Sequence, residues 1–426
     1  MSSKNKATAA QEGAKPALVP KLRFPEFRGT EGWKSIPLNR LASRTKKKNR
    51  DENIDRVLTN SAEFGVLNQR DFFDKDIATQ SNLDGYFVVD LGSYVYNPRI
   101  SSTAPVGPIS KNKIGTGVMS PLYTVFKFKD DRNDFYEHFF KTTGWHTYMR
   151  QASSTGARHD RMAISSDDFM AMPLPTPSPD EQQKIADCLS SVDELMAAQA
   201  RKVDALKTHK KGLMQQLFPR EGETQPRFRF PEFKNAGDWK FRTIGDMFSL
   251  INGCAFKPED WKPTGTPIIR IQNLNDPSAE FNYSQEPVPE RNRIESGDLL
   301  FAWSGTLGSS FGARVWNGPS GVLNQHIFKV LMDEQQITLP FALLVLARVE
   351  EDIAKRSHGF KASFVHVKKS DLVKIDLPLP SLPEQQRIAS CLSSLDALIT
   401  AETQKLEALK THKKGLMQQL FPPAIS

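Results

Sequence analysis

Two stretches of the chain, 181–218 and 384–421, carry apolar residues at intervals that alternate between four and three. This spacing is typical of a helix with one apolar seam, as in a coiled coil. Pro179 and Pro383, each followed by acidic residues, favour a helix start at the N-terminal end of each stretch. The seam residues are expected to be Ile185, Leu189, Val192, Met196, Val203, Leu206, Leu213 and Leu217, and then Ile388, Leu392, Leu395, Ile399, Leu406, Leu409, Leu416 and Leu420.

Neither apolar stripe is expected to face water, because each buried seam residue contributes about 1.5–3 kcal/mol. The nearest partner of equal length is the other stripe, so we predict that the two helices pair. At ~1.5 Å per residue, about 37 residues form a rod of roughly 55 Å. An antiparallel pair would hold the globular regions at opposite ends, related by a pseudo-twofold axis.

Polar residues interrupt both seams at matched positions: Gln199 and Glu402 at one place, Lys210 and Lys413 at another. Isolated polar residues in a seam can fix the register and orientation of paired helices. Frayed or solvent-facing helix ends explain the same residues equally well. The sequence leaves both explanations open.

The two stretches belong to a longer internal repeat. They match at 27 of 38 positions, and "LKTHKKGLMQQLFP" occurs without a substitution at 206–219 and 409–422. Upstream of each lies "RFPEF", followed by Trp33 or Trp239, and each helix follows a proline-rich segment. Each half of the chain therefore has the same order of segments.

The regions inside each repeat, roughly 37–172 and 244–376, hardly resemble each other, and both read as mixed α/β. Expected strands lie in "GYFVVDLGSYVYN", "SPLYTVFKF", "TPIIRIQNL", "GDLLFAW" and "HIFKVLM", and expected helices in "DFYEHFFKTTGWHTYMRQ" and "LPFALLVLARVEEDIAKR". The predicted class is α+β, with the divisions 1–20 (disordered leader), 21–180 (first domain), 181–222 (first helix), 223–383 (second domain), 384–421 (second helix) and 422–426 (tail).

Composition predicts a soluble cytoplasmic protein: 38% of residues are hydrophobic, and no apolar run approaches the ~20 residues of a membrane helix. The N-terminal segment lacks the apolar region of a secretory signal. Cys188, Cys254 and Cys391 form no CxxC motif and are expected to be small buried thiols in a reducing compartment. A net charge of +8 favours an anionic partner such as nucleic acid.

Catalytic motifs are nearly absent. No GxxxxGK[ST] phosphate loop occurs, and the glycine-rich "SGTLGSSFG" lacks its lysine. "NPRI" at 97–100 shares only two residues with the NPPY-type motif of amino-methyltransferases, and no histidines show the HExxH spacing of a zinc site. The chain is predicted to be no catalyst and to hold no metal.

Recognition residues are plentiful on the loops. Arg, Lys, Asn and Gln read base edges, each good bidentate contact giving about 1–3 kcal/mol of discrimination. The DNA-binding candidates of the first region are Asn97, Arg99, Arg158, His159 and Arg161, with Lys111 and Lys113 for phosphates. Those of the second region are Arg270, Gln272, Asn273, Trp303, Ser304, Asn324, Gln325, His326, His358, Lys361 and Ser363. For any single residue, a solvated surface position is the competing explanation.

Six segments of the chain resemble the specificity subunit of type I restriction-modification enzymes. They are "PLPTPSPDEQQKIADCLSSVD", "PLPSLPEQQRIASCLSSLD", "ESGDLLFAWSGTLG", "LGSYVYNPR", "STGARHDRMAI" and "SHGFKASFVHV". The resemblance covers nearly the whole chain after residue 20. The first region departs from the family's Gly-Asp turn at Gly92–Ser93.

The resemblance implies two target recognition domains, each reading one half of a split, asymmetric DNA sequence. It also implies two conserved helices, packed antiparallel, that set the unspecified spacer and dock two modification subunits. Half-sites would then lie roughly one turn of DNA apart, near ~34–36 Å. The modification subunits would carry the S-adenosylmethionine chemistry, and a motor-nuclease (restriction) subunit would use ATP and Mg²⁺. This chain would bind none of these cofactors.

Two other functions remain open from the residues alone. One is a self-sufficient nuclease or methyltransferase, against which the missing motifs argue. The other is a coiled-coil scaffold without a DNA role, which would leave the basic charge and the two divergent, loop-rich regions unexplained.

Overall fold

The computed structural model describes residues 18–50, 53–72, 83–153, 160–357 and 364–423. Most of the predicted leader therefore lies outside the described residues. The chain divides into two compact units: unit 1 is Met1–Ala200 with Gln404–Ser426, and unit 2 is Arg201–Thr403. Each unit thus unites one variable region with parts of both long helices, because those helices are buried against each other as well as against the domain.

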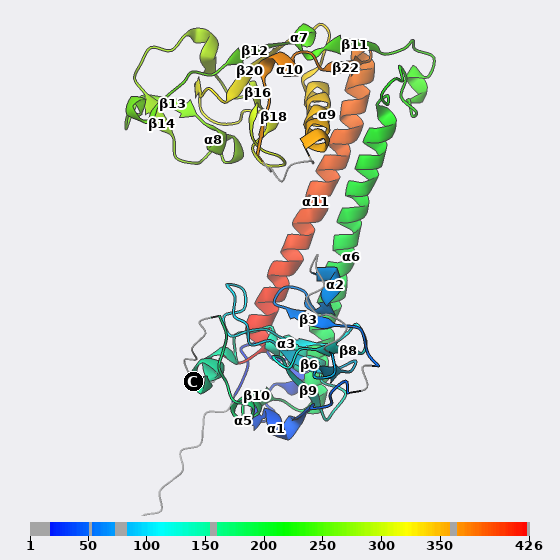
Figure 1. Ribbon diagram of the computed structural model, residues 1–426, viewed down its shortest axis with the longest axis vertical. Helices are drawn as coiled ribbons and strands as arrows, with labels where there is room; N and C mark the ends of the chain where they lie inside the picture. Colours follow the sequence, from blue (N-terminus) through cyan, green and yellow to red (C-terminus); the bar gives the residue numbers. More distant parts are fainter. Residues whose placement is uncertain (1–17, 51–52, 73–82, 154–159, 358–363, 424–426) are drawn as a thin grey trace, which may run out of the picture. The chain divides into compact units, whose positions relative to one another are not determined.

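Unit 1 is built on a four-stranded antiparallel sheet of order β2-β9-β6-β7 (Figure 1). Its strands are Ala42–Arg44, Thr124–Phe128, Tyr94–Tyr96 and Ile109–Lys111. Three strand pairs accompany it: β1 (Lys34–Pro37) with β10 (Pro173–Thr176), β3 (Leu58–Ser61) with β4 (Gly65–Asn68), and β5 (Phe87–Val89) with β8 (Gly117–Met119). The short helices of unit 1 include α1 (Leu38–Leu41), α2 (Gln69–Phe72) and α5 (Ser166–Met170).

Unit 2 contains a four-stranded antiparallel sheet of order β12-β20-β16-β18 and a second sheet of order β14-β13-β19-β15. The first sheet consists of Phe248–Asn252, Ile327–Met332, Leu299–Ala302 and Gly312–Val315, and the second of Asn282–Ser284, Thr266–Ile269, Gly321–Leu323 and Arg293–Ile294. Two further pairs are β11 (Lys240–Thr243) with β22 (Asp376–Leu379) and β17 (Ser304–Thr306) with β21 (Phe364–His366). Its short helices are α7 (Ile244–Met247), α8 (Ile271–Asn275) and α10 (Lys369–Leu372).

The two variable regions share one topology although their sequences hardly match. The strand order β2-β9-β6-β7 of unit 1 equals β12-β20-β16-β18 of unit 2. The strand pair β1–β10 that closes the first domain recurs as β11–β22. Each pair brings the start of its variable region beside the proline-rich segment before the long helix. The internal repeat therefore extends through the whole of each half.

The prediction of a single helix over 134–151 is wrong. The structure has α3 (Asp134–Phe140) and α4 (His146–Ala152), with a turn between them. Thr142 accounts for the break: its hydroxyl donates to the carbonyl of Phe139 and accepts from the amide of Gly144, and such local side-chain bonds compete with the helix ladder. The other expected helix is present as α9 (Leu339–Ser357).

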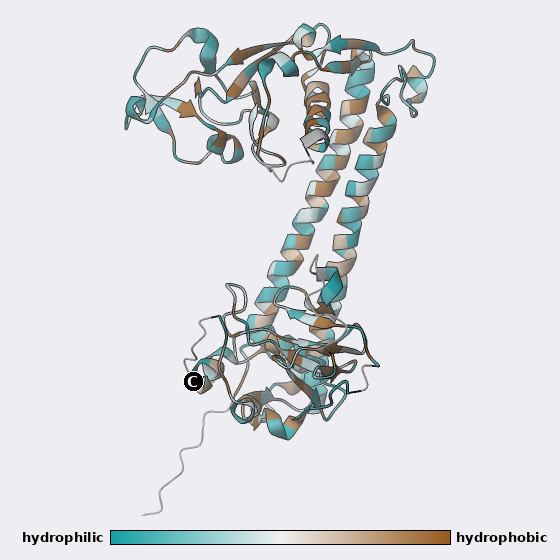
Figure 2. Cartoon of the chain, in the orientation of Figure 1, coloured by the Kyte–Doolittle hydropathy of each residue, from teal (hydrophilic) through white to brown (hydrophobic). Residues whose placement is uncertain are grey.

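The long helices are α6 (Pro179–Leu217) and α11 (Leu382–Leu420), each of 39 residues. In each unit they lie side by side, and the N-terminal part of one packs with the C-terminal part of the other (Figure 1). All sixteen predicted seam residues are buried or half-buried. Figure 2 shows hydrophobic and hydrophilic bands that alternate along α6 and α11. The antiparallel coiled coil is thereby confirmed.

Polar residues in the seam form ion pairs between the helices. Lys413 of α11 lies 2.5 Å from Asp193 of α6 in unit 1, and Lys210 of α6 lies 2.6 Å from Asp396 of α11 in unit 2. These pairs are the same contact in the two copies of the repeat. The buried Glu402 also pairs with Lys202 at 3.0 Å. The seam lysines and Glu402 therefore favour one register, and they do not mark frayed ends.

The repeated "RFPEF" motif clamps each domain onto the start of its own long helix. In unit 1, Arg23 donates two hydrogen bonds of 2.7 Å to Glu181 at the start of α6. In unit 2, Arg229 donates bonds of 2.7 and 2.8 Å to Glu384 of α11. Both carboxylates are buried, with side chains 1% exposed. The glutamate of each "EQQ" is thus part of a bidentate ion pair, the strongest geometry for this kind of contact.

The C-terminal end of each long helix packs into an aromatic core. In unit 1, Phe421 lies 5.2 Å from Phe135 and 5.9 Å from Phe139 between ring centroids. In unit 2, Phe218 stacks on Phe341 at 5.6 Å. Phe218 and Phe421 belong to the repeated 14-residue segment, so the end of the repeat is buried in both units. Within the described residues, no helix is long and apolar enough to cross a membrane.

Glu350 of unit 2 has a half-buried carboxylate with no ion-pair contact to any described residue. Glu350 of α9 accepts a hydrogen bond of 2.7 Å from the amide of Ala313. A Cβ atom at position 312 would stand only 2.0 Å from this carboxylate, so the position requires glycine. Gly312 also has a φ of +110°. Burial raises the pKa of Glu350 from 4.5 to about 7. The folded state therefore holds this proton more tightly than the unfolded chain does.

Replacement of Glu350 by glutamine is expected to remove a pH dependence of stability. Because the folded pKa lies above the unfolded one, the wild-type unit loses stability as pH rises from about 4.5 to about 7, by up to about 3 kcal/mol. Glu350→Gln should thus be more stable than wild type at pH 8 and nearly equal at pH 4.5 in urea unfolding. The exposed neighbour Glu351→Gln is the control. A stability difference that does not change with pH would contradict this assignment.

Candidate nucleic-acid interface

Five of the predicted DNA-binding residues of unit 2 line one cavity. Arg270 and Gln272 reach it from the start of α8, and Asn324, Gln325 and His326 reach it from the turn between β19 and β20. The cavity has a volume of about 330 Å³ and is completed by Phe256, Trp261, Ile271 and Ile327. Loops separated by some 50 residues in the sequence therefore converge on a single concave site.

Stacking and hydrogen bonds hold the cavity wall in place. The guanidinium of Arg270 lies 4.7 Å from the ring centroid of Trp261, and it also bonds to the side chain of Asn282. Asn273 is fully buried. Its amide oxygen accepts from the backbone of Arg270 at 3.0 Å, and its amide nitrogen donates to Ala279 at 3.1 Å. Asn273 is therefore a capping residue of α8, and the structure corrects its prediction as a base reader.

A cluster of aromatic rings adjoins this cavity. Trp303 donates its indole N–H to the carbonyl of Gln325 at 3.1 Å. Its ring lies 5.4 Å from His326 and 4.7 Å from His366. Ser304 is buried in the β17–β21 ladder, opposite His366, which gives it a structural position and corrects its prediction as a contact residue. His358, Lys361 and Ser363 lie outside the described residues.

Unit 1 brings together the two loops that were predicted to act in it. Arg99 and Arg161 face each other in a single antiparallel bridge, in the same topological place as the β17–β21 ladder of unit 2. Asn97 is buried. It donates to the carbonyl of Asn60 at 3.0 Å and accepts from the amide of Arg99, so it shapes the loop and does not present an edge to a ligand. Arg158 and His159 lie outside the described residues.

Lys111 and Lys113 lie apart from that loop pair, beside α3. Lys111 is 2.7 Å from Asp134, and Lys113 is 2.7 Å from Glu137. Together with Lys127 they line a separate cavity of about 400 Å³. These ion pairs leave less charge for phosphates than the sequence implies, although the side chain of Lys113 is 61% exposed.

A run of cations that the prediction omitted lies after β2. Lys46, Lys47, Lys48 and Arg50 are all exposed, and within the described residues none has an acidic side chain at ion-pair distance. The run is anchored by the backbone: the amide of Val88 donates to Lys47, and the amide of Asn49 donates to Tyr86. The sequence signal was the dense run "TKKKNR", which is typical of a phosphate-facing segment.

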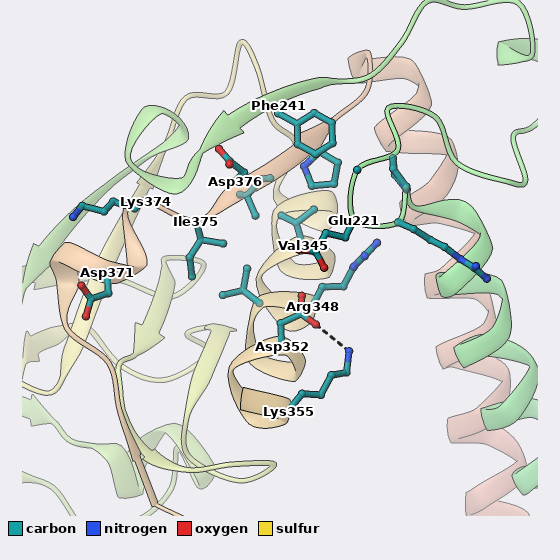
Figure 3. A pocket seen from close by; sticks show the side chains of 16 residues that line it. Glu221, Phe241, Val345, Arg348, Asp352, Lys355, Asp371, Lys374, Ile375 and Asp376 are labelled. Atoms are coloured by element: carbon teal, nitrogen blue, oxygen red, sulfur yellow. Dashed lines mark hydrogen bonds and ion pairs between the residues drawn. The ribbon is translucent and has the colours of Figure 1, made fainter. Parts of the chain in front are cut away.

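Another cavity of unit 2, of about 870 Å³, has a different character (Figure 3). It lies beside α9, where Arg348 stacks over the ring of Phe218 at 4.5 Å. Asp352 and Lys355 pair with each other at 2.9 Å on the same helix. The remaining charged residues on its wall are Arg220, Glu221, Asp371, Lys374 and Asp376. With acidic and basic groups in balance, this cavity is poorly suited to a phosphate backbone.

Residues 236–411 match a protein family described as the type I restriction modification DNA specificity domain. A type I restriction enzyme specificity subunit of Methanocaldococcus jannaschii, MjaVIII, is 25% identical over 338 residues, which cover 74% of both chains. Residues 236–411 therefore belong to that domain family, and over most of its length this chain is similar to type I specificity subunits. The EcoBI specificity subunit of Escherichia coli is likewise 25% identical, over 44% of this chain and 39% of its own length.

Solved structures share the fold of this chain. A chain from the structure of a type I restriction-modification system aligns over 92% of this chain and 98% of its own, with a TM-score of 0.57 and 16% identity. The S subunit of a type I restriction-modification system from M. genitalium aligns over 96% of this chain and 100% of its own, with a TM-score of 0.55 and 15% identity. A family defined by DNA specificity argues against a scaffold without a DNA role.

Proposed function

We propose that this chain reads a split DNA sequence, with each of its two domains contacting one half. The observation that carries the proposal is the common topology of units 1 and 2, combined with unlike side chains on matching loops. Where unit 1 has Arg99 beside Arg161, unit 2 has the Ser304–Thr306 strand beside Phe364–His366. One scaffold with two different reading surfaces is suited to two different half-sites.

The contact groups divide into two kinds. Lys46, Lys47, Lys48 and Arg50 are suited to phosphates, which position a protein on DNA without reading its sequence. Arg99, Arg161 and the residues around Arg270 are suited to base edges, because arginine and amide side chains form bidentate pairs with them. The phosphate-type cations follow β2 of unit 1, and the candidates for base edges include Arg99 after β6 of unit 1 and Arg270 at the start of α8 in unit 2.

The paired helices are proposed to set the distance between the half-sites. The seam is buried along both helices, and the pairs Asp193–Lys413 and Lys210–Asp396 favour one register. A slip by one heptad would separate both pairs. The helices would therefore hold the two half-sites at one fixed distance, which we call the ruler proposal.

The 14 identical residues support a second role for the helices, the docking of two modification subunits. Buried seam positions need only be apolar, yet identity also covers positions exposed in both copies: Lys207, Thr208, His209, Lys211, Gln215 and Gln216, and their counterparts Lys410, Thr411, His412, Lys414, Gln418 and Gln419. All eleven differences between the 38-residue repeats fall upstream of this segment. Two copies of one partner, each contacting the same exposed face, would account for that pattern.

Charge reversal on this face tests the docking proposal. Lys211→Glu is expected to remove one of two modification subunits from the complex, and Lys211→Glu with Lys414→Glu to weaken binding of both by about tenfold or more. Native mass spectrometry of co-expressed complexes gives the stoichiometry. Lys234→Glu, on the exposed surface of unit 2, is the control. An unchanged two-copy complex in the double variant would exclude this face.

The chain is proposed to act without chemistry of its own. Among the described residues, no three His, Cys, Asp or Glu side chains gather to hold a metal ion. S-adenosylmethionine would be used by the modification subunits, and ATP with Mg²⁺ by a motor-nuclease subunit. Addition of these cofactors to the purified chain alone is expected to give neither methylation nor cleavage of DNA.

An exchange of one variable region tests the reading of half-sites. Residues 37–172 would be replaced by the corresponding region of a relative with another specificity, and methylated sites would be mapped by sequencing the host genome. One half of the methylated sequence is expected to change, with the other half and the spacer retained. Exchange of 244–376 is the matched experiment for the other half. A change in both halves after one exchange would refute the proposal.

A further inference from the structure

The cavity of unit 2 contains polar atoms that have no partner. Trp261 Nε1, Asn324 Oδ1 and His326 Nδ1 are buried, and none forms a hydrogen bond within the described part of the chain. All three residues line the same cavity of about 330 Å³. Buried polar groups are normally satisfied, so these three atoms are available to a ligand that enters the cavity.

The three groups form a mixed set of donors and acceptors. The indole N–H of Trp261 can only donate, and the amide of Asn324 can donate and accept. His326 Nε2 lies 3.4 Å from the amide nitrogen of Gln325, so it is placed to accept, and Nδ1 then carries the proton. Burial, and then the nearby His366, lower the pKa of His326, which favours this neutral form. The edge of a nucleobase offers the same mixture of donors and acceptors.

The remaining wall suits a flat aromatic ligand. Phe256, Ile271 and Ile327 supply apolar surface, and Arg270 lies over the face of Trp261. Lys257 and Lys262 are exposed on the loop that carries Trp261, and Lys257 pairs with the exposed Glu259 at 3.9 Å. Lys262 is suited to a phosphate beside a bound nucleotide.

The concave shape decides how DNA can fill this site. Bases stacked in a duplex show only their edges on the groove floor, and protruding loops read them there. A cavity takes a base that has left the stack, as in enzymes that turn out a nucleotide. We propose that this cavity receives one nucleobase, turned out of the half-site that unit 2 reads. The inference rests on the proposed function and adds a mode of reading to it.

Fluorescence of base analogues tests the inference. The intact complex with its modification subunits is mixed with target duplexes that carry 2-aminopurine, or pyrrolo-cytosine, at one position of the second half-site at a time. A several-fold increase is expected at one position other than the methylated adenine, which a methyltransferase turns out by itself. Trp261→Phe and Asn324→Ala should abolish the increase at that position and retain it at the methylated adenine. Gln335→Ala, exposed on the turn after β20, should change neither signal.

A second measurement needs no variant. An abasic residue opposite the extruded base removes the energy needed to unpair it, so the wild-type complex should bind that duplex about tenfold more tightly. Brightening at the methylated adenine alone, with no tighter binding to any abasic duplex, would overturn the inference and leave the proposed function intact. Loss of all sequence-specific binding by the wild-type complex would overturn the proposed function as well.

Discussion

Replacement of Glu384 by alanine is expected to destabilise unit 2 by about 3–5 kcal/mol. The substitution leaves the guanidinium of Arg229 buried, with a side chain 8% exposed, and without its carboxylate. It also removes the acceptor for the indole N–H of Trp239, 3.3 Å away. An unpaired buried charge is far more costly than the loss of a surface contact, so this effect should exceed that of any single seam truncation at half-buried positions.

The repeat supplies a matched set of controls. Glu181→Ala breaks the equivalent pair with Arg23 and should destabilise unit 1 to a similar extent. Glu232→Ala breaks the pair between Glu232 and Arg387, in which each side chain is 47% exposed. It is expected to destabilise unit 2 by about 1 kcal/mol or less. Hydrogen exchange resolved by peptide assigns the loss to one unit or the other. Equal effects of Glu384→Ala and Glu232→Ala would contradict the buried-clamp assignment.

The helices were predictable because their signal is periodic. Residues such as Ile185, Leu189 and Val192 recur at seam spacing, and burial follows directly from that pattern. The partners of the seam lysines were not predictable, because Asp193 and Lys413 are 220 residues apart. Likewise, "RFPEF" was visible as a repeat, but its function as a clamp emerged only when Arg23 was placed beside Glu181.

The recognition loops show where sequence reasoning ends. Polar residue type predicted Asn97 and Asn273 as base readers, whereas both amides are buried and hold the backbone of their own loops. Side-chain chemistry alone does not separate a residue that shapes a loop from one that faces a ligand. The convergence of Arg270 and His326 on one cavity also depends on strand order, which the diverged sequences did not show.

Lengthening both helices by one heptad is expected to lengthen the spacer of the DNA target by about 3 base pairs. Duplication of 196–202 in α6 and of 399–405 in α11 adds seven residues to each helix at matching positions of the repeat. Seven residues at ~1.5 Å extend a helix by about 10 Å, and DNA rises by ~3.4 Å per base pair. The seven-residue period keeps Asp193 opposite Lys413 and Lys210 opposite Asp396.

Duplication in a single helix is the control for this experiment. It would move one set of seam residues out of register with its partners, so at most one of the two ion pairs could form along a continuous seam. That variant is expected to be less stable than wild type by several kcal/mol, since seam residues lose apolar burial. The double duplication should retain wild-type stability in the same urea unfolding experiment.

The most direct measurement is methylome sequencing of a host that expresses the modification subunits with the doubly lengthened chain. The ruler proposal predicts that both half-site sequences are unchanged and that the unspecified bases between them increase by about three. A methylated sequence with the wild-type spacer, from a variant shown to be folded and assembled, would contradict it.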